Sequence, residues 1–209
     1  GRTNLTEMGI GENDWFVCLH TRDPSYLKAW RPQYSDLWKT RDFRNCNIEN
    51  YFDAMDYITK MGGYVVRMGA VVEAPLPDLK NLKIIDYATL HRSDFMDIYL
   101  GSKCLFAIST GSGWDNIPEM QRRPIVYVNF MPLGNIHTTR AEFLAITKRC
   151  VLQESHETLT LREIFTHGVG FCIDTLVYKS KGVELIENTP EEIRDVAIEM
   201  AERLAGTWQ

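Results

Sequence analysis

The chain has 209 residues, of which 44% are hydrophobic, and its formal net charge at pH 7 is −5. This composition is that of an ordinary globular protein with room for one large domain, and the negative charge argues against nucleic acid or an anionic membrane as the main partner. The five cysteines lack CxxC or Cys/His ligand spacing, no apolar run approaches the roughly 18 residues that span a bilayer, and the first fourteen residues are polar. We therefore expect a cytoplasmic protein without a membrane span, in which residues 1–14 are a flexible lead-in.

The first predicted strand is an apolar run from Trp15 to His20, of a composition that is typical of a strand buried on both faces of a parallel sheet. It ends at the polar cluster His20-Thr-Arg-Asp23. Open α/β sheets bind ligands outside the carboxyl ends of their strands, so this cluster is a candidate site. An ordinary solvated turn, with a structural role for the histidine, is the alternative.

Helices and strands are then expected to alternate. Residues 24–45 form an aromatic and basic connection that either covers the site or is a surface flap. Predicted helices follow at residues 47 to about 61, 94 to about 103 and about 114 to 122, and predicted strands at residues 64–67, 84–87, 104–108 and 124–129. This order predicts an α/β fold, a Rossmann-like parallel sheet with helices on both faces, because parallel strands need right-handed crossover connections.

The pattern is weaker after residue 130. It predicts a loop through His137, a possible helix near residues 140–147, a short helix near residues 161–167 and a clear helix from the capping Thr189 to about residue 204. Residues 15–209 are expected to form a single domain.

One turn has the composition of a phosphate cradle. It lies between a predicted strand and a predicted helix, where backbone N–H groups and the positive helix end favour an anion. Its candidate phosphate-binding residues are Ser109, Thr110, Gly111, Ser112 and Gly113. The turn matches neither the P-loop nor the GxGxxG pattern, so ATP hydrolysis and nicotinamide chemistry lose support. A serine-rich turn without a ligand is the alternative.

Two predicted strands end in arginine, at Arg22 and at Arg67. Side chains at the same sheet edge could converge on one anion, and the planar guanidinium grips phosphate oxygens in pairs. For Arg67, a surface ion pair is the alternative. The sequence has no Asp-x-Asp pair, so we expect no metal and transfer chemistry in which positive groups stabilise a departing diphosphate.

Several of these stretches resemble a known family. The run from His20 to Asp23 resembles the His-x-Arg motif of the O-fucosyltransferase-like GT-B glycosyltransferases, and the run from Asp97 to Gly113 resembles their later nucleotide-diphosphate motif. The stretches at residues 43–51 and 62–69 extend the similarity, over roughly residues 15–130, to a bacterial set of predicted glycosyltransferases found with surface-polysaccharide genes. In one departure, Asp23 follows Arg22 directly, whereas the fucosyltransferase motif has a glycine before its aspartate.

The resemblance implies a nucleotide-sugar-binding domain, the C-terminal, donor-binding half of a GT-B fold that uses a nucleotide-diphosphate sugar without metal. It implies that Arg22 binds the donor phosphates and stabilises the leaving diphosphate, and that Ser109, Thr110 and Ser112 hold phosphate or ribose. His20 is a second catalytic candidate. A GT-B enzyme has two Rossmann-like domains and this sequence accounts for one, so we expect an N-terminal acceptor domain in the full-length protein and no activity without it.

Two alternatives remain open on the sequence. One is a non-catalytic module of the same fold that binds a nucleotide, a phosphosugar or a partner protein. The other is a metal-free sugar-nucleotide epimerase or hydrolase, whose phosphate clamp would look the same.

Overall fold

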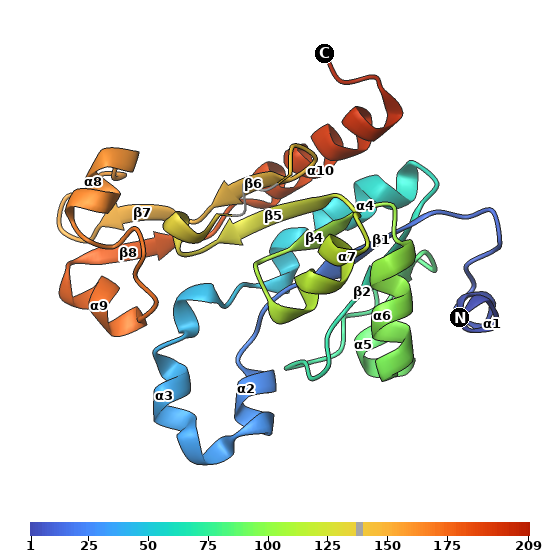
Figure 1. Cartoon of the computed structure of the whole chain (residues 1–209), viewed down its shortest axis with the longest axis horizontal. Coiled ribbons are helices and arrows are strands. Elements are labelled where there is room, and N and C mark those ends of the chain that lie inside the picture. Colours follow the sequence, from blue (N-terminus) through green and yellow to red (C-terminus); the bar gives the residue numbers. More distant parts are fainter. Residues whose placement is uncertain (137–139) are drawn as a thin grey trace.

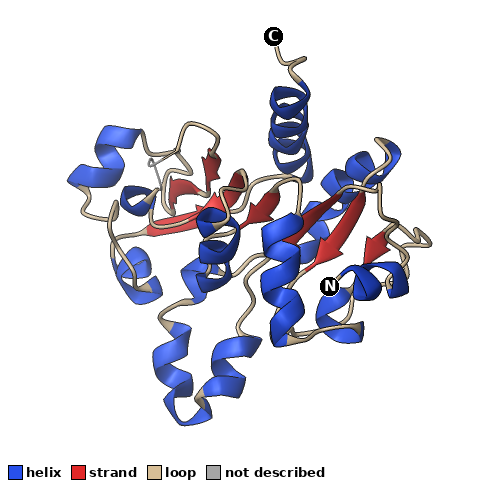
Figure 2. Cartoon of the chain, turned by 45° about the vertical axis from the view of Figure 1, so that its right-hand side comes forward, coloured by secondary structure: helices blue, strands red, loops and turns tan. Residues whose placement is uncertain are grey.

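A six-stranded parallel sheet forms the centre of the protein in the computed structural model, which describes residues 1–136 and 140–209 (Figures 1 and 2). The strand order is β3-β2-β1-β4-β5-β6, and each neighbouring pair is parallel. This is the Rossmann order, in which the direction of winding reverses between β1 and β4. The α/β prediction is confirmed. The strands are β1 (Phe16–His20), β2 (Tyr64–Arg67), β3 (Ile84–Ile85), β4 (Ala107–Ser109), β5 (Ile125–Phe130) and β6 (Leu144–Thr147).

Helices cover both faces of this sheet. On one face, α4 (Phe52–Lys60) packs against α10 (Pro190–Ala205), and on the other lie α6 (Asp94–Lys103) and α7 (Asn116–Met120). The burial of β1 shows why its sequence is apolar throughout: alternate side chains enter the two cores, and all four from residue 16 to residue 19 are at most 4% exposed.

Shorter elements complete the chain. They are the helices α1 (Arg2–Glu7), α2 (Ser25–Trp30), α3 (Ser35–Lys39), α5 (Tyr87–Leu90), α8 (Leu161–Thr166) and α9 (Thr175–Ser180), and the 3-10 helices Pro32–Tyr34, Asp42–Arg44, Ile48–Tyr51, Gly113–Asp115 and Leu133–Asn135. In Figures 1 and 2, α2 and α3 project together from one end of the molecule.

The helix starts follow the caps that the sequence carries. The Ser93 hydroxyl accepts the N–H of Met96 at the start of α6, as predicted. Thr189 and Glu192 form a reciprocal capping box at the start of α10, which ends at Gly206 in the left-handed conformation (φ 72°).

Residues 148–188 form a small lobe beside the main sheet, on the left of Figure 1. Its two strands, β7 (Arg149–Leu152) and β8 (Val183–Ile186), are antiparallel, and α8 and α9 lie between them in the chain. A third hydrophobic core holds the lobe together and includes Phe43 from the connection after β1.

One predicted element is wrong, and two regions contain structure that the sequence pattern did not predict. The helix expected near residues 140–147 is wrong, because residues 144–147 form β6 and pair with β5. Residues 1–14, expected to be a flexible lead-in, contain α1, and Met8 and Ile10 are buried in the core. The sequence pattern gave no sign of β7, α9 or β8. His137, in the predicted loop, lies outside the described residues.

No helix in the described part of the chain has the length and apolar character needed to cross a bilayer. The five cysteines all lie in described segments and are free thiols.

Candidate functional site

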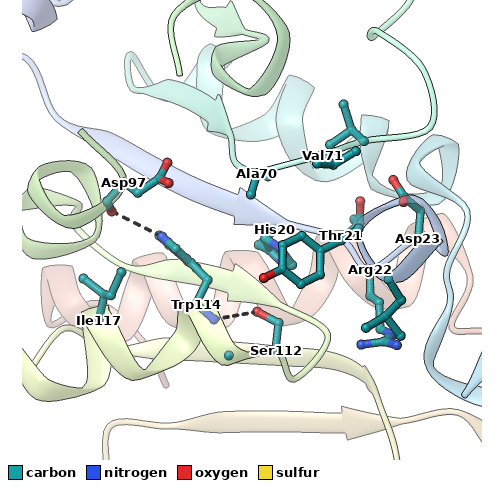
Figure 3. A pocket seen from close by; sticks show the side chains of 15 residues that line it. His20, Thr21, Arg22, Asp23, Ala70, Val71, Asp97, Ser112, Trp114 and Ile117 are labelled. Atoms are coloured by element: carbon teal, nitrogen blue, oxygen red, sulfur yellow. Dashed lines mark hydrogen bonds between the residues drawn. The ribbon is translucent and has the colours of Figure 1, made fainter. Parts of the chain in front are cut away.

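A cavity of about 340 Å³ lies at the carboxyl ends of β1, β2 and β4, where the winding of the sheet reverses (Figure 3). We call it the switch-point cavity. Open α/β sheets bind their ligands at this place. The end of β1, the loop after β2, helix α2 and the turn after β4 supply its walls.

The walls combine a few polar groups with an apolar majority. The basic and acidic side chains that line the cavity are His20, Arg22, Asp23 and Asp97. The apolar and aromatic lining consists of Tyr26, Leu27, Ala70, Val71, Val72, Trp114 and Ile117. A mostly apolar cavity with a few polar groups is typical of sites for small organic ligands.

His20 stacks on Trp114, with ring centroids 6.0 Å apart and planes inclined by 14°. Burial lowers the pKa of His20 to about 4, and the positive charges of Arg67 and Arg22 add to this effect while Asp23 opposes it. Its Nδ1 is buried and has no hydrogen-bond partner among the described residues. At neutral pH the ring is therefore uncharged, with one nitrogen that can donate and one that can accept a hydrogen bond.

The two carboxylates in the cavity are engaged by the fold. Asp23 accepts the N–H of Ser25 at 2.7 Å and the N–H of Glu73 at 3.0 Å, which ties the start of α2 to the loop after β2. Asp97 accepts the Tyr87 hydroxyl at 2.8 Å, and its backbone carbonyl accepts the indole N–H of Trp114. Asp97 thereby helps to hold the ring that stacks on His20.

Arg22 has no ion-pair partner among the carboxylates of residues 1–136 and 140–209. Its backbone is fixed, because its N–H donates to the Thr110 hydroxyl at 3.2 Å and its carbonyl accepts the N–H of Cys46 at 2.9 Å. The Nε of its guanidinium is buried without an acceptor in the described chain. Burial lowers the pKa of Arg22, and the charge of Arg41 lowers it further. The fork of this arginine is free for an anionic ligand.

Arg67 is placed differently. Its guanidinium is buried against Asp86, at 3.0 Å, and also donates to the Ala74 carbonyl. Asp86 in turn accepts the N–H of Leu76 and the hydroxyl of Thr89. The ion-pair alternative thus describes Arg67, although the pair is buried, and we assign this arginine to the fold.

The serine turn is divided between structure and cavity. The Ser109 hydroxyl donates to the Asp115 carboxylate, and Thr110 accepts from the Arg22 backbone; both side chains are buried. Asp115 also accepts the N–H of Ser112 at 2.6 Å, in a capping box. Hydrogen bonds within the fold therefore already occupy part of the groups that were expected to bind a phosphate.

Ser112 and Gly113 are the residues of this turn that line the switch-point cavity. Gly111 has a φ of 85°, in the left-handed region, and turns the chain between the two halves of the motif.

A second, smaller cavity of about 150 Å³ adjoins this turn. Arg41 and Arg44 line it, and it shares Ser112 with the switch-point cavity. The sequence reasoning missed both arginines, because it treated their connection only as a cover or a flap. The signal present in the sequence is the pair of arginines that flanks Asp42 and Phe43.

Within the described residues, no group of three or more His, Cys, Asp or Glu side chains is placed to hold a metal ion. Comparison with protein-family models, with curated proteins and with solved structures gives no match to this chain.

Proposed function

We propose that this chain is the donor-binding domain of a GT-B glycosyltransferase and that it binds a nucleotide-diphosphate sugar in the switch-point cavity. The observation that carries the proposal is the guanidinium of Arg22, which has no partner among the described residues and lines the same cavity as Ser112, at the carboxyl edge where the winding of the sheet reverses. A partly buried cation without a protein partner is costly, and a bound diphosphate would offset that cost.

The rest of the cavity suits the nucleoside or the sugar. Its volume of about 340 Å³ falls within the range of roughly 300–1,000 Å³ that is typical of small-ligand sites. Trp114 and Tyr26 offer flat apolar surfaces for a base or a sugar ring. The neutral His20 can hydrogen-bond a ribose or sugar oxygen without repelling Arg22.

In the proposed reaction, the bond between the anomeric carbon and the diphosphate oxygen breaks as an acceptor hydroxyl attacks that carbon and loses its proton to a base supplied from outside this domain. Negative charge grows on the departing diphosphate, and Arg22 stabilises it there. The acceptor would be held by an N-terminal domain of the full-length protein, and bacterial polysaccharide synthesis is the setting that the resemblance suggests. The positive charge in this scheme comes from arginine.

One observation favours a second candidate, a non-catalytic module that binds a nucleotide or a phosphosugar. His20, with a pKa of about 4, is a weak base, and hydrogen bonds within the fold already hold Asp23 and Asp97. A deprotonating base for an acceptor would therefore have to come from elsewhere.

The test is calorimetric titration of the chain with UDP, GDP and CDP and their sugar conjugates, with and without a chelator. We expect one base to bind preferentially, with equal affinity in both conditions. At 100 times its Kd this ligand should stabilise the fold by about 2.7 kcal/mol, which a thermal melt would detect. Binding that requires Mg²⁺ or Mn²⁺, or no binding by any nucleotide, would contradict the proposal. Release of nucleoside diphosphate by the full-length protein separates the enzyme from the module.

A further inference from the structure

The connection between β1 and α4 returns to the end of β1 and brings two more arginines beside Arg22. The N–H of Cys46 donates to the Arg22 carbonyl at 2.9 Å, which fixes the two chain segments together. Arg41 and Arg44 lie just before this contact and line the 150 Å³ cavity, whose other walls include Gly111 and Ser112. Three guanidinium groups from two segments thus gather around the serine turn.

No carboxylate in the described ranges forms an ion pair with any of the three. The Nε atoms of Arg22 and Arg44 are buried without an acceptor there. Burial lowers the pKa of Arg44 to about 10, and the charges of Arg22 and Arg41 contribute to this shift. The charges of Asp42 and Asp23 act on Arg22 without forming an ion pair: Asp42 is exposed and accepts the side-chain amide of Asn45, and Asp23 accepts two backbone N–H groups. The cluster is therefore a local concentration of positive charge, only partly offset by these two carboxylates, in a chain whose net charge is −5.

The small lobe holds this segment rigidly. Thr175 donates its N–H to the Thr40 carbonyl at 2.8 Å, and its hydroxyl accepts the N–H of Phe43 at 2.9 Å. One nitrogen of Arg41 donates to the Ile173 carbonyl at 3.0 Å. Phe43 itself is buried in the core of the lobe. Mutually repelling cations on a backbone that the fold holds in place are a partly preorganised binding site, because the segment that carries them does not have to be ordered when the anion arrives.

We propose that Arg22, Arg41 and Arg44 form an anion site for phosphoryl groups, which holds the end of the diphosphate farther from the nucleoside. The cavity beside Arg41 and Arg44 is smaller than the roughly 300 Å³ at which sites for whole small ligands begin, so it fits a small group and not a nucleoside. A phosphoryl group offers the charge and the several oxygens that three forks can share, and a carboxylate offers only two oxygens. The statement about the nucleoside rests on the proposed function. The anion site itself is argued from the three arginines alone.

The probe is inorganic pyrophosphate, titrated calorimetrically at constant ionic strength into the whole chain and into two variants, Arg41→Gln and Arg44→Gln. Each should bind about tenfold more weakly, which corresponds to about 1.4 kcal/mol. The matched control is Arg31→Gln: it removes the same charge from the same connection, but Arg31 is exposed and stacks on Trp30, with its guanidinium carbon 4.3 Å from the ring centroid. The control should bind within twofold of the parent.

Melting temperatures without ligand separate binding from folding. Arg44→Gln removes one of three repelling cations and no hydrogen bond that holds the fold, so it should be at least as stable as Arg31→Gln, whereas Arg41→Gln also loses the hydrogen bond to Ile173. Arg44→Lys, which keeps the charge but not the fork, should recover part of the affinity. The proposal is overturned if pyrophosphate does not bind the parent, if both variants bind as well as the control, or if both melt well below it.

Nucleotide titrations distinguish the two proposals. If pyrophosphate binds in an arginine-dependent manner and no nucleotide binds more tightly, the anion site stands and the nucleotide-sugar function fails. If a nucleoside diphosphate binds and the Arg41 and Arg44 variants bind it as the control does, the function stands and the three-arginine site fails.

Discussion

At the scale of single residues, Arg22 combines an ordered backbone at the end of a strand with a side chain that is available to a ligand. Its backbone is held on both sides, by Thr110 and by Cys46, and its guanidinium is left without a protein partner in the described chain. A charge-assisted hydrogen bond contributes about 1.5–3 kcal/mol. Arg22→Ala should therefore weaken nucleoside-diphosphate binding by about tenfold to a hundredfold in calorimetric titration.

Two controls accompany this prediction. Arg22→Lys should recover only part of the affinity, since a point charge cannot reproduce a bidentate fork. The melting temperature of the unliganded Arg22→Ala protein should hardly change. If that variant unfolds, or binds as tightly as the parent, Arg22 serves the fold and the donor-site proposal loses its main support.

His20 makes a separate prediction about pH. Its pKa is about 4 in the fold, below the ordinary value of 6.5, so the unfolded chain binds a proton more readily than the folded chain between these values. The free energy of unfolding should consequently fall as the pH drops from 7 to 4.5, with His20 contributing on the order of 2–3 kcal/mol to the loss.

The measurement is urea unfolding at pH 7 and at pH 4.5, in the parent and in His20→Gln. The glutamine cannot take up the proton, so the variant should lose less stability over this interval, whereas titration of the carboxylates affects both proteins alike. An identical loss in the two proteins would mean that the fold does not hold the imidazole in its neutral form.

Residue-level reasoning from the sequence placed Arg22 just after the end of a strand, because a strand end is visible as an apolar run that stops. It could not determine the role of Arg67, although Arg67 also ends a strand. Its partner Asp86 stands nineteen positions later, and only the pairing of β2 with β3 brings the two together. The same limit hid Arg41 and Arg44, whose segment has no period and is placed by contacts with the small lobe.

At the scale of elements, the turn after β4 contains two glycines with different roles, one in the fold and one in the candidate site. Gly111 has a φ of 85°, and an added Cβ would lie 2.8 Å from the Phe130 ring. Nothing lies within 4 Å of a Cβ added at Gly113. We expect Gly111→Ala to destabilise the fold by about 1–3 kcal/mol, through backbone strain and this clash.

Gly113→Val, in contrast, should leave the melting temperature nearly unchanged and weaken nucleotide binding, because its side chain would enter the switch-point cavity. Paired melting and titration experiments on the two variants check both halves of this prediction. Parental affinity in a folded Gly113→Val protein would show that the ligand does not approach this turn.

Elements with strong local signals were predicted well. The bounds of β2 and α6 agree with the sequence pattern, because Gly62-Gly63 and the capping Ser93 mark their starts locally. The strand β6 was mistaken for a helix: it is four residues long, only partly buried, and at the edge of the main sheet, so its state depends on pairing with β5.

At the scale of the whole molecule, the small lobe contacts the segment that carries Arg41 and Arg44, although the two are far apart in the sequence. The Thr175 hydroxyl contacts Thr40 and Phe43, which stand more than 130 positions earlier. Thr175→Val removes both contacts and should cost about 1–2 kcal/mol of unfolding free energy. Because it loosens the segment that carries Arg41 and Arg44, it should also weaken pyrophosphate binding several-fold.

The matched control for this prediction is Thr166→Val, in the same lobe. The hydroxyl of Thr166 donates only within its own helix, to the Glu163 carbonyl, so its loss should leave pyrophosphate affinity unchanged. Equal pyrophosphate affinities in the two variants would show that the contacts with the lobe do not support the anion site. Unfolding in urea and calorimetric titration provide the two readouts.

The packing of α10 against α4 has a consequence for how the protein is made. One face of β1, the strand that ends at the candidate site, is closed by α4 together with a helix that comes last in this sequence. During synthesis the apolar side chains of β1 and α4 stay exposed until residues 190–205 have been made and can complete their core. Exposed apolar surface of this kind promotes aggregation. The nascent chain therefore carries Arg22 long before it can fold around a ligand, and its maturation should depend on chaperones that shield this face until translation has passed α10.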